Sequence, residues 1–595
     1  MKKDEQKHID FITGASGDRA FGKTERSAYT PDIRANIEKL YEDKFGLFVH
    51  WGPYAQLGGV WQGEEVAAEW IMNRAKIPVK VYEEQAAGLF TPERFNAKDW
   101  VDIAEQAGMK FIVVTAKHHD GFAMYGSKHP YNLVDFADFG RDVLKELAEE
   151  CRQRGMKLGF YYSQSQDWHE EGAVGNIWDF PANARDAGFD PYFEEKVMPQ
   201  LEELTTEYGD VFMVWFDTPV HMNDRHCEAL MALIAKNQPG ALVNSRLGNG
   251  YGHFDVSIDA GKRPNVCKAD WLPDLKVPWQ THETVTKGGW GYTTYGSETD
   301  RSADYAELIG HVCNVVCYGG VFLLNVGPRP DGVIPPSQVS SLRAIGDWLT
   351  VNGESIYGAD PSPLVFPPYA ITSKPGKLYL HLREILNNQV SLQGILTGVT
   401  KAYCLADPAQ TALDFSQDGA ELAVTVPDAA IQLHVTVIVL ELAAEQAQVA
   451  DETLQQNADG SIELPAESCE FAVRRTSYDY DRKVTVRWGE HPLQGLLWTV
   501  NVSAPGEFCV ISEDSGDERL EYELITRDDT LMLNALSGEV GVLSKKPQTG
   551  TIRIEQAGRQ QIVVYPRVTA RLNWSYNFKG LELVPVHEGG EVRRH

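Results

Sequence analysis

The sequence predicts an α/β protein: a (β/α)8-like TIM barrel followed by C-terminal antiparallel β-sandwich domains. From residue 39 to residue 358, short apolar runs alternate with amphipathic helical patterns. Beyond that point apolar and polar residues alternate between turn residues, which is typical of antiparallel sheets. No glycine-rich phosphate loop follows the first apolar run, so a barrel is favoured over a dinucleotide-binding sheet.

Six apolar runs in the first part are predicted to be parallel strands. They are short, continuous and rich in Val, Ile, Phe and Leu, as strands covered on both faces are. The runs are 45–51, 111–117, 157–163, 211–217, 241–246 and 320–326. Between them, residues 141–155 predict a helix, because Leu144, Leu147 and Cys151 recur at helical spacing and Gly155 provides a C-terminal stop.

The change in pattern also divides the chain into domains. The Pro-rich junction PSPLVFPP separates the barrel from alternating runs such as LYLHL, VSLQGIL, ELAVTV and LHVTVIVLEL, which predict a sandwich. A polar stretch then precedes a second β-rich segment. The predicted units are an N-terminal arm (1–38), the barrel (39–358), a β-sandwich (359–445), a linker (446–480) and a second β-rich domain (481–595).

Composition and charge exclude several classes of partner. The chain has 595 residues, and 55 Lys and Arg against 84 Asp and Glu give a net charge of −29. Without a basic cluster, neither nucleic acid nor a membrane is an expected partner. The start MKKDEQKHID lacks the apolar core of a secretory signal, and no run spans a bilayer, so a cytoplasmic protein is predicted. Eight cysteines without a CxxC pair do not form a disulfide framework.

Four of the predicted strands end in residues that chemistry uses. These endings are His50-Trp51, Lys117 to Asp120, Tyr161 to Ser163, and Trp215 to Asp217. In a parallel barrel the carboxyl ends of the strands converge on one face, so these side chains are expected to line one pocket. His, Tyr and Trp suit sugar recognition, and an Asp at the pocket floor can attack an anomeric carbon. Adjacent ligands chelate poorly, so His118-His119-Asp120 predicts no metal, and no cofactor is expected.

Seven segments together resemble the α-L-fucosidases of glycoside hydrolase family 29. They are KFGLFVHWGPY, AEW, TAKHHDGF, GFYYS, VWFDTP, LLNVGPRPDG and WLTVNGESIYG. The similarity covers about 40–358 and continues more weakly to about 442. Residues 481–595 lie outside it and only loosely resemble an appended carbohydrate-binding domain.

This resemblance implies an exo-acting retaining hydrolase that releases α-L-fucose from oligosaccharides or glycoconjugates through a covalent fucosyl-Asp. Asp217 matches the nucleophile of the family, although helix capping is an alternative role for it. The implied sugar-binding residues are His50, Glu69, Trp70, His118, His119, Tyr161 and Trp215, with Arg246 as a further cleft residue. Trp215 could instead be core packing, and only one of Tyr161 and Tyr162 can face the barrel interior. The sequence does not indicate an oligomeric state.

The general acid departs from the family pattern. Many relatives carry Trp-Glu before a segment that ends in Trp-Gly-Tyr, whereas this chain has Gln280 in PWQTHETVTKGGWGY. Glu283 is the first candidate for the acid/base, Asp259 is the alternative, and Asp255, Glu298 or no acid remain open. A related α-L-glycosidase, such as an α-L-galactosidase, or a catalytically weakened fucose-binding protein are the alternative functions.

Overall fold

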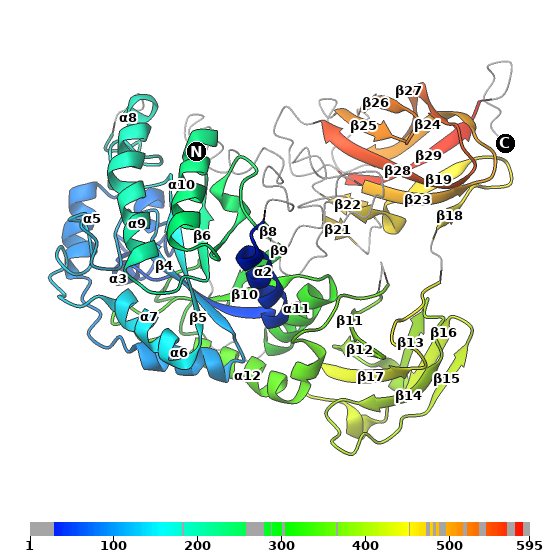
Figure 1. The fold of residues 1–595 in the computed structure, drawn as a ribbon, viewed down its shortest axis with the longest axis horizontal. Helices are drawn as coiled ribbons and strands as arrows, with labels where there is room; N and C mark the ends of the chain where they lie inside the picture. The colour runs from blue at the N-terminus through cyan, green and yellow to red at the C-terminus, as the bar shows by residue number, and fades with distance from the viewer. Residues whose placement is uncertain are drawn as a thin grey trace.

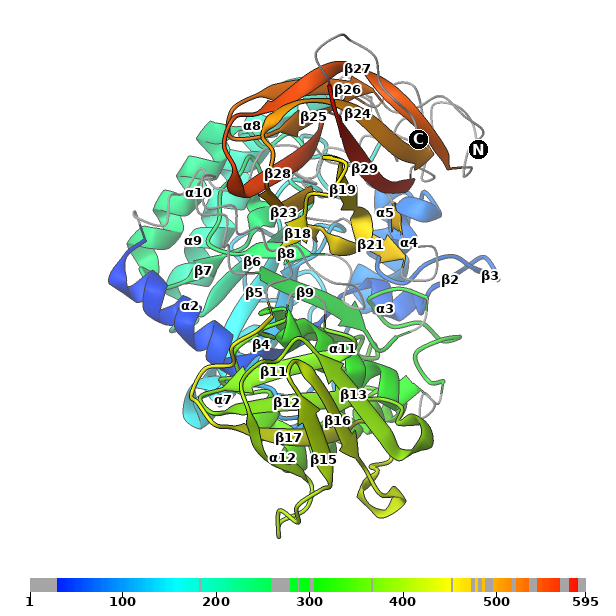
Figure 2. The ribbon, with the colours of Figure 1, turned by 90° about the vertical axis from the view of Figure 1, so that its right-hand side faces the viewer.

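The computed structural model describes the chain from Tyr29 to Val586 except for several short segments. The segments outside the description are 1–28, 181–183, 258–278, 287, 300–303, 365–366, 451–452, 472–476, 480–483, 487–495, 516–520, 535–542, 568–576 and 587–595. Figures 1 and 2 show three bodies along the chain: a barrel with helices around it, a small β-sandwich, and a C-terminal β domain.

An eight-stranded parallel sheet forms the barrel, in the order β7-β6-β5-β4-β1-β10-β9-β8. Its strands are β1 (Phe45–Val49), β4 (Phe111–Lys117), β5 (Lys157–Ser163), β6 (Met213–Asp217), β7 (Leu242–Val243), β8 (Asp255–Ser257), β9 (Trp279–Thr284) and β10 (Val321–Val326). A parallel bridge between Asn244 and Phe254 joins the two end strands and closes the sheet. The predicted barrel is confirmed, and all six predicted strands belong to it.

Two barrel strands were not predicted. Strand β8 is short, and β9 has the polar sequence WQTHET, which lacks the continuous apolar character expected of a covered strand. Only a single 3-10 turn, η4 (Ser245–Leu247), connects β7 to β8 within the described residues. The barrel is therefore less regular here than a strict strand–helix alternation.

Helices surround the barrel (Figure 1). They are α2 (Pro31–Asp43), α3 (Tyr54–Leu57), α4 (Ile71–Arg74), α5 (Val79–Gln85), η2 (Ala87–Leu89), α6 (Ala97–Gln106), α7 (Val143–Arg154), α8 (Ala184–Tyr192), the π-helix η3 (Phe193–Val197), α9 (Met198–Thr206), α10 (Asp224–Asn237), α11 (Tyr305–Cys317), α12 (Pro336–Asn352) and η6 (Gly353–Ser355). The hairpin β2 (Val60–Trp61) and β3 (Glu64–Glu65) lies among them. Helix α7 fulfils its prediction, with Asp142 as N-cap and Gly155 as left-handed C-cap. Helix α2 shows that part of the predicted N-terminal arm is structured.

The pleat of the barrel strands separates two apolar layers, because successive side chains point to opposite faces. Phe48, Tyr161 and Trp215 belong to a core inside the barrel. Leu47, Tyr162 and Phe216 belong to the larger core between barrel and helices. A residue's position along a strand therefore decides whether its side chain reaches the interior of the barrel.

The predicted β-sandwich is formed by two antiparallel sheets that follow α12. One has the order β11-β12-β17-β14 and the other the order β13-β16-β15. The strands are β11 (Ala370–Lys374), β12 (Lys377–Leu382), β13 (Gln389–Gln393), β14 (Val399–Cys404), β15 (Phe415–Asp418), β16 (Glu421–Thr425) and β17 (Thr436–Leu442), with 3-10 turns η7 (Leu386–Asn388) and η8 (Asp428–Ala430). Inward-facing residues of both sheets form a shared core.

The C-terminal domain contains two further sheets with a core of their own. The strands are β18 (Leu454–Gln455), β19 (Ile462–Pro465), β20 (Glu470–Phe471), β21 (Ser477–Asp479), β22 (Val484–Val486), β23 (Leu496–Val502), β24 (Gly506–Ser515), β25 (Glu521–Ile525), β26 (Thr530–Asn534), β27 (Ser544–Ile554), β28 (Gly558–Arg567) and β29 (Asn577–Pro585), with the 3-10 turn η9 (Ala466–Ser468). The stretch 446–480, predicted as a linker, supplies β18 to β21. Its few apolar residues, such as Ile462 and Leu464, are fully buried when β19 pairs with β29.

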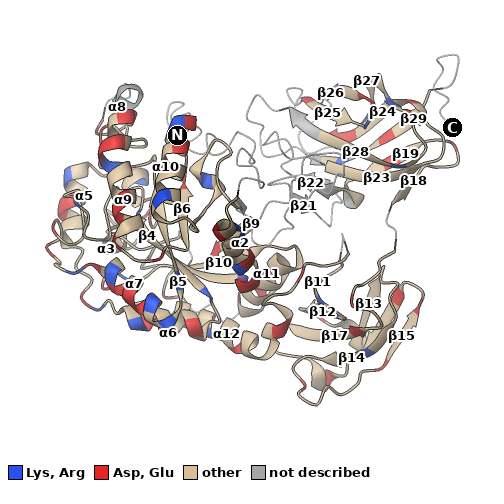
Figure 3. Ribbon diagram, in the orientation of Figure 1, with Lys and Arg blue, Asp and Glu red and all other residues tan. Residues whose placement is uncertain are grey.

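Figure 3 shows that basic and acidic residues are interspersed on the helices of the barrel, including α6 and α7. Several of them pair, such as Lys98 with Asp102 on the surface of α6. Among the described helices, none combines the length and the apolar character needed to cross a membrane. The cytoplasmic location stays a prediction.

Candidate active site

Asp217 lies at the end of β6, and its carboxylate is fixed by charged and polar side chains from three elements. Tyr161 at the end of β5 donates its hydroxyl to Oδ2 over 2.7 Å. Arg246 in η4 donates from Nε to Oδ1 over 2.6 Å, and its Nη2 also contacts Oδ1. Nε2 of His119 lies 3.6 Å from Oδ2. The side chain of Asp217 is 13% exposed, so the carboxylate remains open to a ligand.

The surroundings of Asp217 keep it ionised. Burial acts to raise the pKa of this carboxyl, but the positive charge of Arg246 and the hydrogen bond from Tyr161 outweigh it, and the pKa falls below its ordinary value. Its backbone N–H donates to Oε1 of Gln164 over 3.0 Å. Asp217 is not a helix N-cap, because β6 continues into a loop and Asn223 caps the next helix, α10.

Two histidines beside Asp217 are neutral, and their hydrogen bonds assign the tautomer. Burial lowers the pKa of His50 to about 4, and its Nδ1 lies 2.7 Å from the amide oxygen of Asn325. Because that oxygen can only accept, Nδ1 carries the proton. In His119, whose pKa burial also lowers well below its usual value, Nδ1 lies 2.7 Å from Ser163, whose hydroxyl donates to a backbone carbonyl. Each ring thus presents Nε2 as a hydrogen-bond acceptor.

His118 stands between these two rings. It lies parallel to Tyr161 with ring centroids 5.4 Å apart, and 4.2 Å from His119. Burial lowers its pKa well below the usual value, and its Nδ1 has no hydrogen-bond partner among the described residues. A buried polar atom without a partner is costly, so a hydroxyl-bearing ligand would satisfy it.

Glu69 and Trp70 reach the site from the segment before α4. The carboxylate of Glu69 accepts the backbone N–H groups of Trp290 (2.7 Å) and Gly291 (2.9 Å). Burial raises the pKa of Glu69 in spite of these bonds. Trp70 is half-buried, and its ring meets the ring of His119 edge to face at 5.0 Å. Trp70 thus contacts His119 directly, and Glu69 is joined to the strand-end residues through Trp290, whose ring lies 5.4 Å from that of His50.

Trp215 and Gln280 lie inside the barrel. The indole of Trp215 stacks on Tyr161 with centroids 5.5 Å apart and is 2% exposed. Its N–H donates to Oε1 of Gln280 over 2.9 Å, and Gln280 is fully buried. Trp215 therefore packs against the ring of Tyr161, and the amide of Gln280 is hydrogen-bonded to Trp215. No hydrogen bond between Gln280 and Asp217 is found among the described residues.

Of the acid/base candidates from the sequence, only Glu283 and Glu298 have described side chains, and both contact partners other than Asp217. Glu283 points to the outer face of β9, where its carboxylate contacts Nδ1 of His311 in α11 at 2.5 Å. The pleat accounts for this, because Gln280 and His282 occupy the inner positions of the same strand. Glu298 pairs with Arg329. Asp259 lies outside the described residues, as does the side chain of Asp255.

Sequence reasoning missed several residues that hold this site together. Asn325 in β10 orients His50, and Gln164 after β5 accepts from the backbone of Asp217. Trp290 and His282 lie against each other at 4.9 Å and border the rings of His50 and Trp215, respectively. Asn325 is the next-to-last residue of the apolar run 320–326, and Gln164 directly follows the run 157–163, so the strand-end signal extends to both. Among the described residues, no three His, Cys, Asp or Glu side chains are grouped so that they could hold a metal ion.

A parallel barrel with a buried carboxylate, neutral histidines and aromatic faces at its carboxyl end has the groups that a carbohydrate-hydrolysing enzyme needs. The model of the α-L-fucosidase family matches residues 20–354, more than half of the chain. The chain belongs to the α-L-fucosidase family and is a glycoside hydrolase. The resemblance drawn from the sequence motifs is thereby confirmed.

Known proteins of this family support the assignment. The tissue α-L-fucosidase of Rattus norvegicus is 31% identical over 356 residues, which cover 56% of this chain and 73% of the relative. The plasma α-L-fucosidase of Homo sapiens is 31% identical over 358 residues, which cover 56% and 72%. The crystal structure of α-L-fucosidase from Vibrio sp. strain EJY3 has a TM-score of 0.66 at 27% identity, covering 94% of this chain and all of that one.

Proposed function

We propose that this enzyme is an exo-acting retaining α-L-fucosidase, with Asp217 as the nucleophile. The observation that carries the proposal is the ionised carboxylate of Asp217, held by Tyr161 and Arg246 at the open end of the barrel. A structure of the Bacteroides thetaiotaomicron α-L-fucosidase, described as a trapped covalent intermediate with 2-fluoro-fucosyl fluoride, supports it by similarity (TM-score 0.60, 26% identity, covering 69% and 96% of the chains). The substrate is a fucosylated oligosaccharide or glycoconjugate.

In the proposed reaction, Asp217 attacks the anomeric carbon of the fucosyl unit. The bond from that carbon to the aglycone oxygen breaks, the departing oxygen takes a proton from a general acid, and a fucosyl-Asp ester forms. Water, deprotonated by the same group acting as base, then attacks the anomeric carbon and releases α-L-fucose. The low pKa of Asp217 serves this step, because only the carboxylate is nucleophilic.

The neutral histidines suit the hydroxyls of the sugar. With Nδ1 protonated, His50 and His119 can each accept a hydrogen bond from a sugar hydroxyl at Nε2. Nδ1 of His118 has no hydrogen-bond partner within the described part of the chain. Nε2 of His119 and Oδ2 of Asp217, 3.6 Å apart, are both acceptors, so a donor such as a sugar hydroxyl is needed beside them. Glu69 and Trp70 complete the proposed sugar-binding set with Tyr161 and Arg246. Trp215 supports the ring of Tyr161 from behind.

The direct test is release of p-nitrophenol from p-nitrophenyl α-L-fucoside. We expect saturable turnover by the wild-type enzyme at neutral pH, with retention of the α configuration when the first product is followed by NMR. A product formed initially as β-L-fucose would contradict the retaining mechanism. No turnover at micromolar enzyme would contradict the fucosidase itself.

The two candidates for the general acid, Glu283 and Asp259, are expected to behave differently when they are replaced. We expect Glu283→Gln to keep activity within about threefold on every substrate, because its carboxylate faces α11. We propose Asp259 as the acid. Its replacement by Asn should then lower kcat/KM for fucosyl oligosaccharides by about a hundredfold or more. The value for aryl fucosides should fall much less, because good leaving groups need little protonation. The ratio of kcat/KM for the two substrate types in each variant is the measurement. The reverse pattern would reassign the acid to Glu283.

Gln280→Glu tests whether the missing family carboxyl matters. Since Gln280 is fully buried, with the Trp215 indole as its hydrogen-bond donor, a glutamate there would bury a carboxyl with a single donor from the described residues. We expect a loss of about 1–3 kcal/mol in the free energy of unfolding and no gain in turnover. Urea unfolding and turnover of the aryl fucoside measure the two effects, with Gln389→Glu on the exposed edge of β13 as the control. A tenfold gain in turnover would show that the acid belonged at this position.

A further inference from the structure

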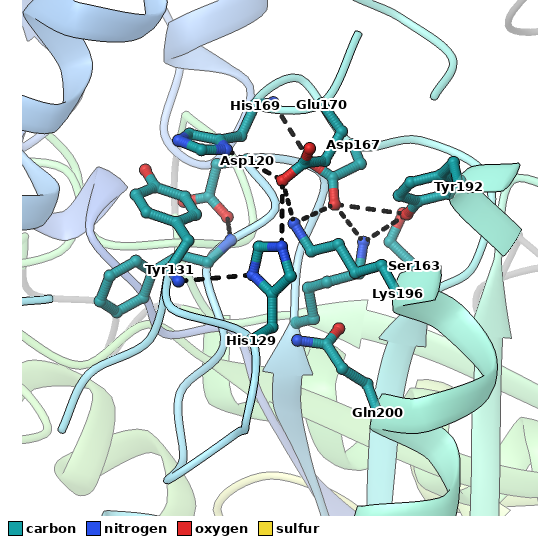
Figure 4. Close-up of polar contacts among 12 residues, drawn as sticks. Asp120, His129, Tyr131, Ser163, Asp167, His169, Glu170, Tyr192, Lys196 and Gln200 are labelled. Carbon is teal, nitrogen blue, oxygen red and sulfur yellow. Dashed lines mark hydrogen bonds and ion pairs between the residues drawn. The ribbon is translucent and has the colours of Figure 1, made fainter. Parts of the chain in front are cut away.

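A buried group of charged side chains lies beside the active site, and the proposed chemistry does not use it (Figure 4). The carboxylate of Asp167 accepts a hydrogen bond from Nζ of Lys117 over 3.1 Å. Nζ of Lys196 lies 2.9 Å from the same oxygen. The side chains of these three residues are between 0% and 3% exposed. Lysine and aspartate side chains are almost never buried this deeply unless they are paired with opposite charges.

Three separate elements bring this cluster together. Lys117 is the last residue of β4, Asp167 follows β5, and Lys196 lies in the π-helix η3. Tyr192, directly before η3, also reaches Asp167, with its hydroxyl 3.3 Å from Oδ2. A π-turn inside helical structure is rare and is often found at functional sites. Here it presents Lys196 and Tyr192 to the same carboxylate.

The cluster is an ion pair network. Burial acts to raise the pKa of Asp167, but the charges of Lys117 and Lys196 outweigh it and hold the pKa well below its usual range. Burial lowers the pKa of Lys117 to about 8. Glu170, 3.0 Å from Lys196, provides a second carboxylate, so that two ammonium groups face two carboxylates. Removing one partner would leave a buried charge uncompensated.

Asp167 is in direct contact with the turn after β4 that carries His118 and His119. Gly121 in this turn has φ +79°, and a Cβ at this position would collide with the carboxylate of Asp167. The N–H of Trp168 donates to the carbonyl of His119 over 2.7 Å. The close approach therefore explains the glycine of the HHDGF segment and joins the turn to residues 163–168.

Residues 163–168, which Asp167 anchors, also hold the nucleophile. Gln164 accepts from the backbone N–H of Asp217 over 3.0 Å and donates to the carbonyl of Arg246 over 2.9 Å. Gln166 donates to the hydroxyl of Thr218 over 3.0 Å. Its carbonyl in turn accepts from Lys117 over 3.4 Å. The same short segment thus contacts His119 on one side and the Asp217–Arg246 pair on the other.

We propose that Asp167 is a positioning residue of this enzyme. Held by Lys117 and Lys196, it fixes residues 163–168 so that His119, Asp217 and Arg246 keep the geometry needed for attack on the anomeric carbon. It touches neither substrate nor the reacting atoms, and it acts through Gln164 and Ser163. This inference rests on the proposed fucosidase function.

The test compares Asp167→Asn with the wild-type enzyme on p-nitrophenyl α-L-fucoside. We expect kcat to fall by at least tenfold and KM to change by less than threefold, because misplacement of the nucleophile affects the transition state more than binding. An unchanged kcat in the folded variant would overturn the proposal. If the wild-type enzyme shows no turnover, the proposed function fails before the variant is measured, so the two failures are distinguishable.

Variants of Lys196 keep the test decisive if Asp167→Asn does not fold. Lys196→Met leaves only Lys117 to neutralise Asp167, and we expect kcat to fall at least fivefold. Lys196→Arg keeps the positive charge, and we expect it to retain at least half of the wild-type kcat. Equal kcat values for the Met and Arg variants would overturn the proposal. Lys98→Met, which removes a surface ion pair on α6, is the matched control and should leave kcat and KM unchanged.

Discussion

Replacement of Asp217 by glycine is expected to lower kcat on the aryl fucoside by at least about a thousandfold, because the proposed covalent route needs the carboxylate of this residue as its nucleophile. Added azide should restore part of the activity by entering the space left by the carboxylate. Azide would attack the anomeric carbon from the side that the Asp217 carboxylate occupies in the wild-type enzyme, opposite the leaving group, so the product is expected to be β-L-fucosyl azide. The measurements are initial rates of p-nitrophenol release and the NMR anomeric assignment of the azide.

Two further variants control this experiment. Asp217→Asn keeps the size of the side chain and should lose activity without azide rescue, since no space is opened. Asp138→Gly makes the same chemical change at an exposed residue with φ +52°, where glycine is well tolerated, and should be fully active. Residual activity of Asp217→Gly above about a tenth of the wild-type value would assign the nucleophile to another residue.

Arg246→Met is expected to shift the acid limb of the pH profile of kcat/KM upward by about one unit or more. Arg246 is the principal charge that lowers the pKa of Asp217 against the effect of burial. Without it the pKa of Asp217 rises, so the carboxylate is protonated, and activity is lost, at a higher pH than in the wild-type enzyme. At neutral pH we also expect kcat/KM to fall by about a hundredfold, because Nε and Nη2 no longer orient the carboxylate.

The matched control is Arg152→Met, which removes an exposed arginine paired with Glu149 on α7. Its pH profile should superimpose on that of the wild-type enzyme. Arg246→Lys keeps the positive charge and loses the two-nitrogen contact, so we expect the acid limb to stay near its wild-type position while kcat/KM falls. An unmoved acid limb in Arg246→Met would contradict the inference that the charge of Arg246 holds the pKa of Asp217 low.

Much of the barrel was predictable because its strands are buried on both faces. Continuous apolar runs such as 111–117 and 320–326 carry their own signal, and the polar residues that follow them mark the face where the site lies. Strand β9 escaped prediction because its inner positions carry Gln280 and His282. Polar side chains inside a barrel find partners only from other strands, here Trp215 of β6, and no local pattern records such a partner.

The acid/base candidates show the same limit within the site. Glu283 and Gln280 are three residues apart, and in a strand this spacing places them on opposite faces. Once β9 is known to be a strand whose inner face carries Gln280, the outward direction of Glu283 follows. The sequence alone had no means of assigning a strand here, so Glu283 remained a candidate.

The sequence by itself determined the fold class and the family, and it singled out Asp217 as the candidate nucleophile, because these depend on periodicity and on motifs that are contiguous in the chain. Only the tertiary structure decided which side chains surround Asp217 and which protonation state and tautomer each of them has. The tautomers of His50 and His119 depend on Asn325 and Ser163 from other strands. The buried charges of Lys117, Asp167 and Lys196 are acceptable only because folding brings them within hydrogen-bond distance of one another, where their attraction offsets the cost of leaving water.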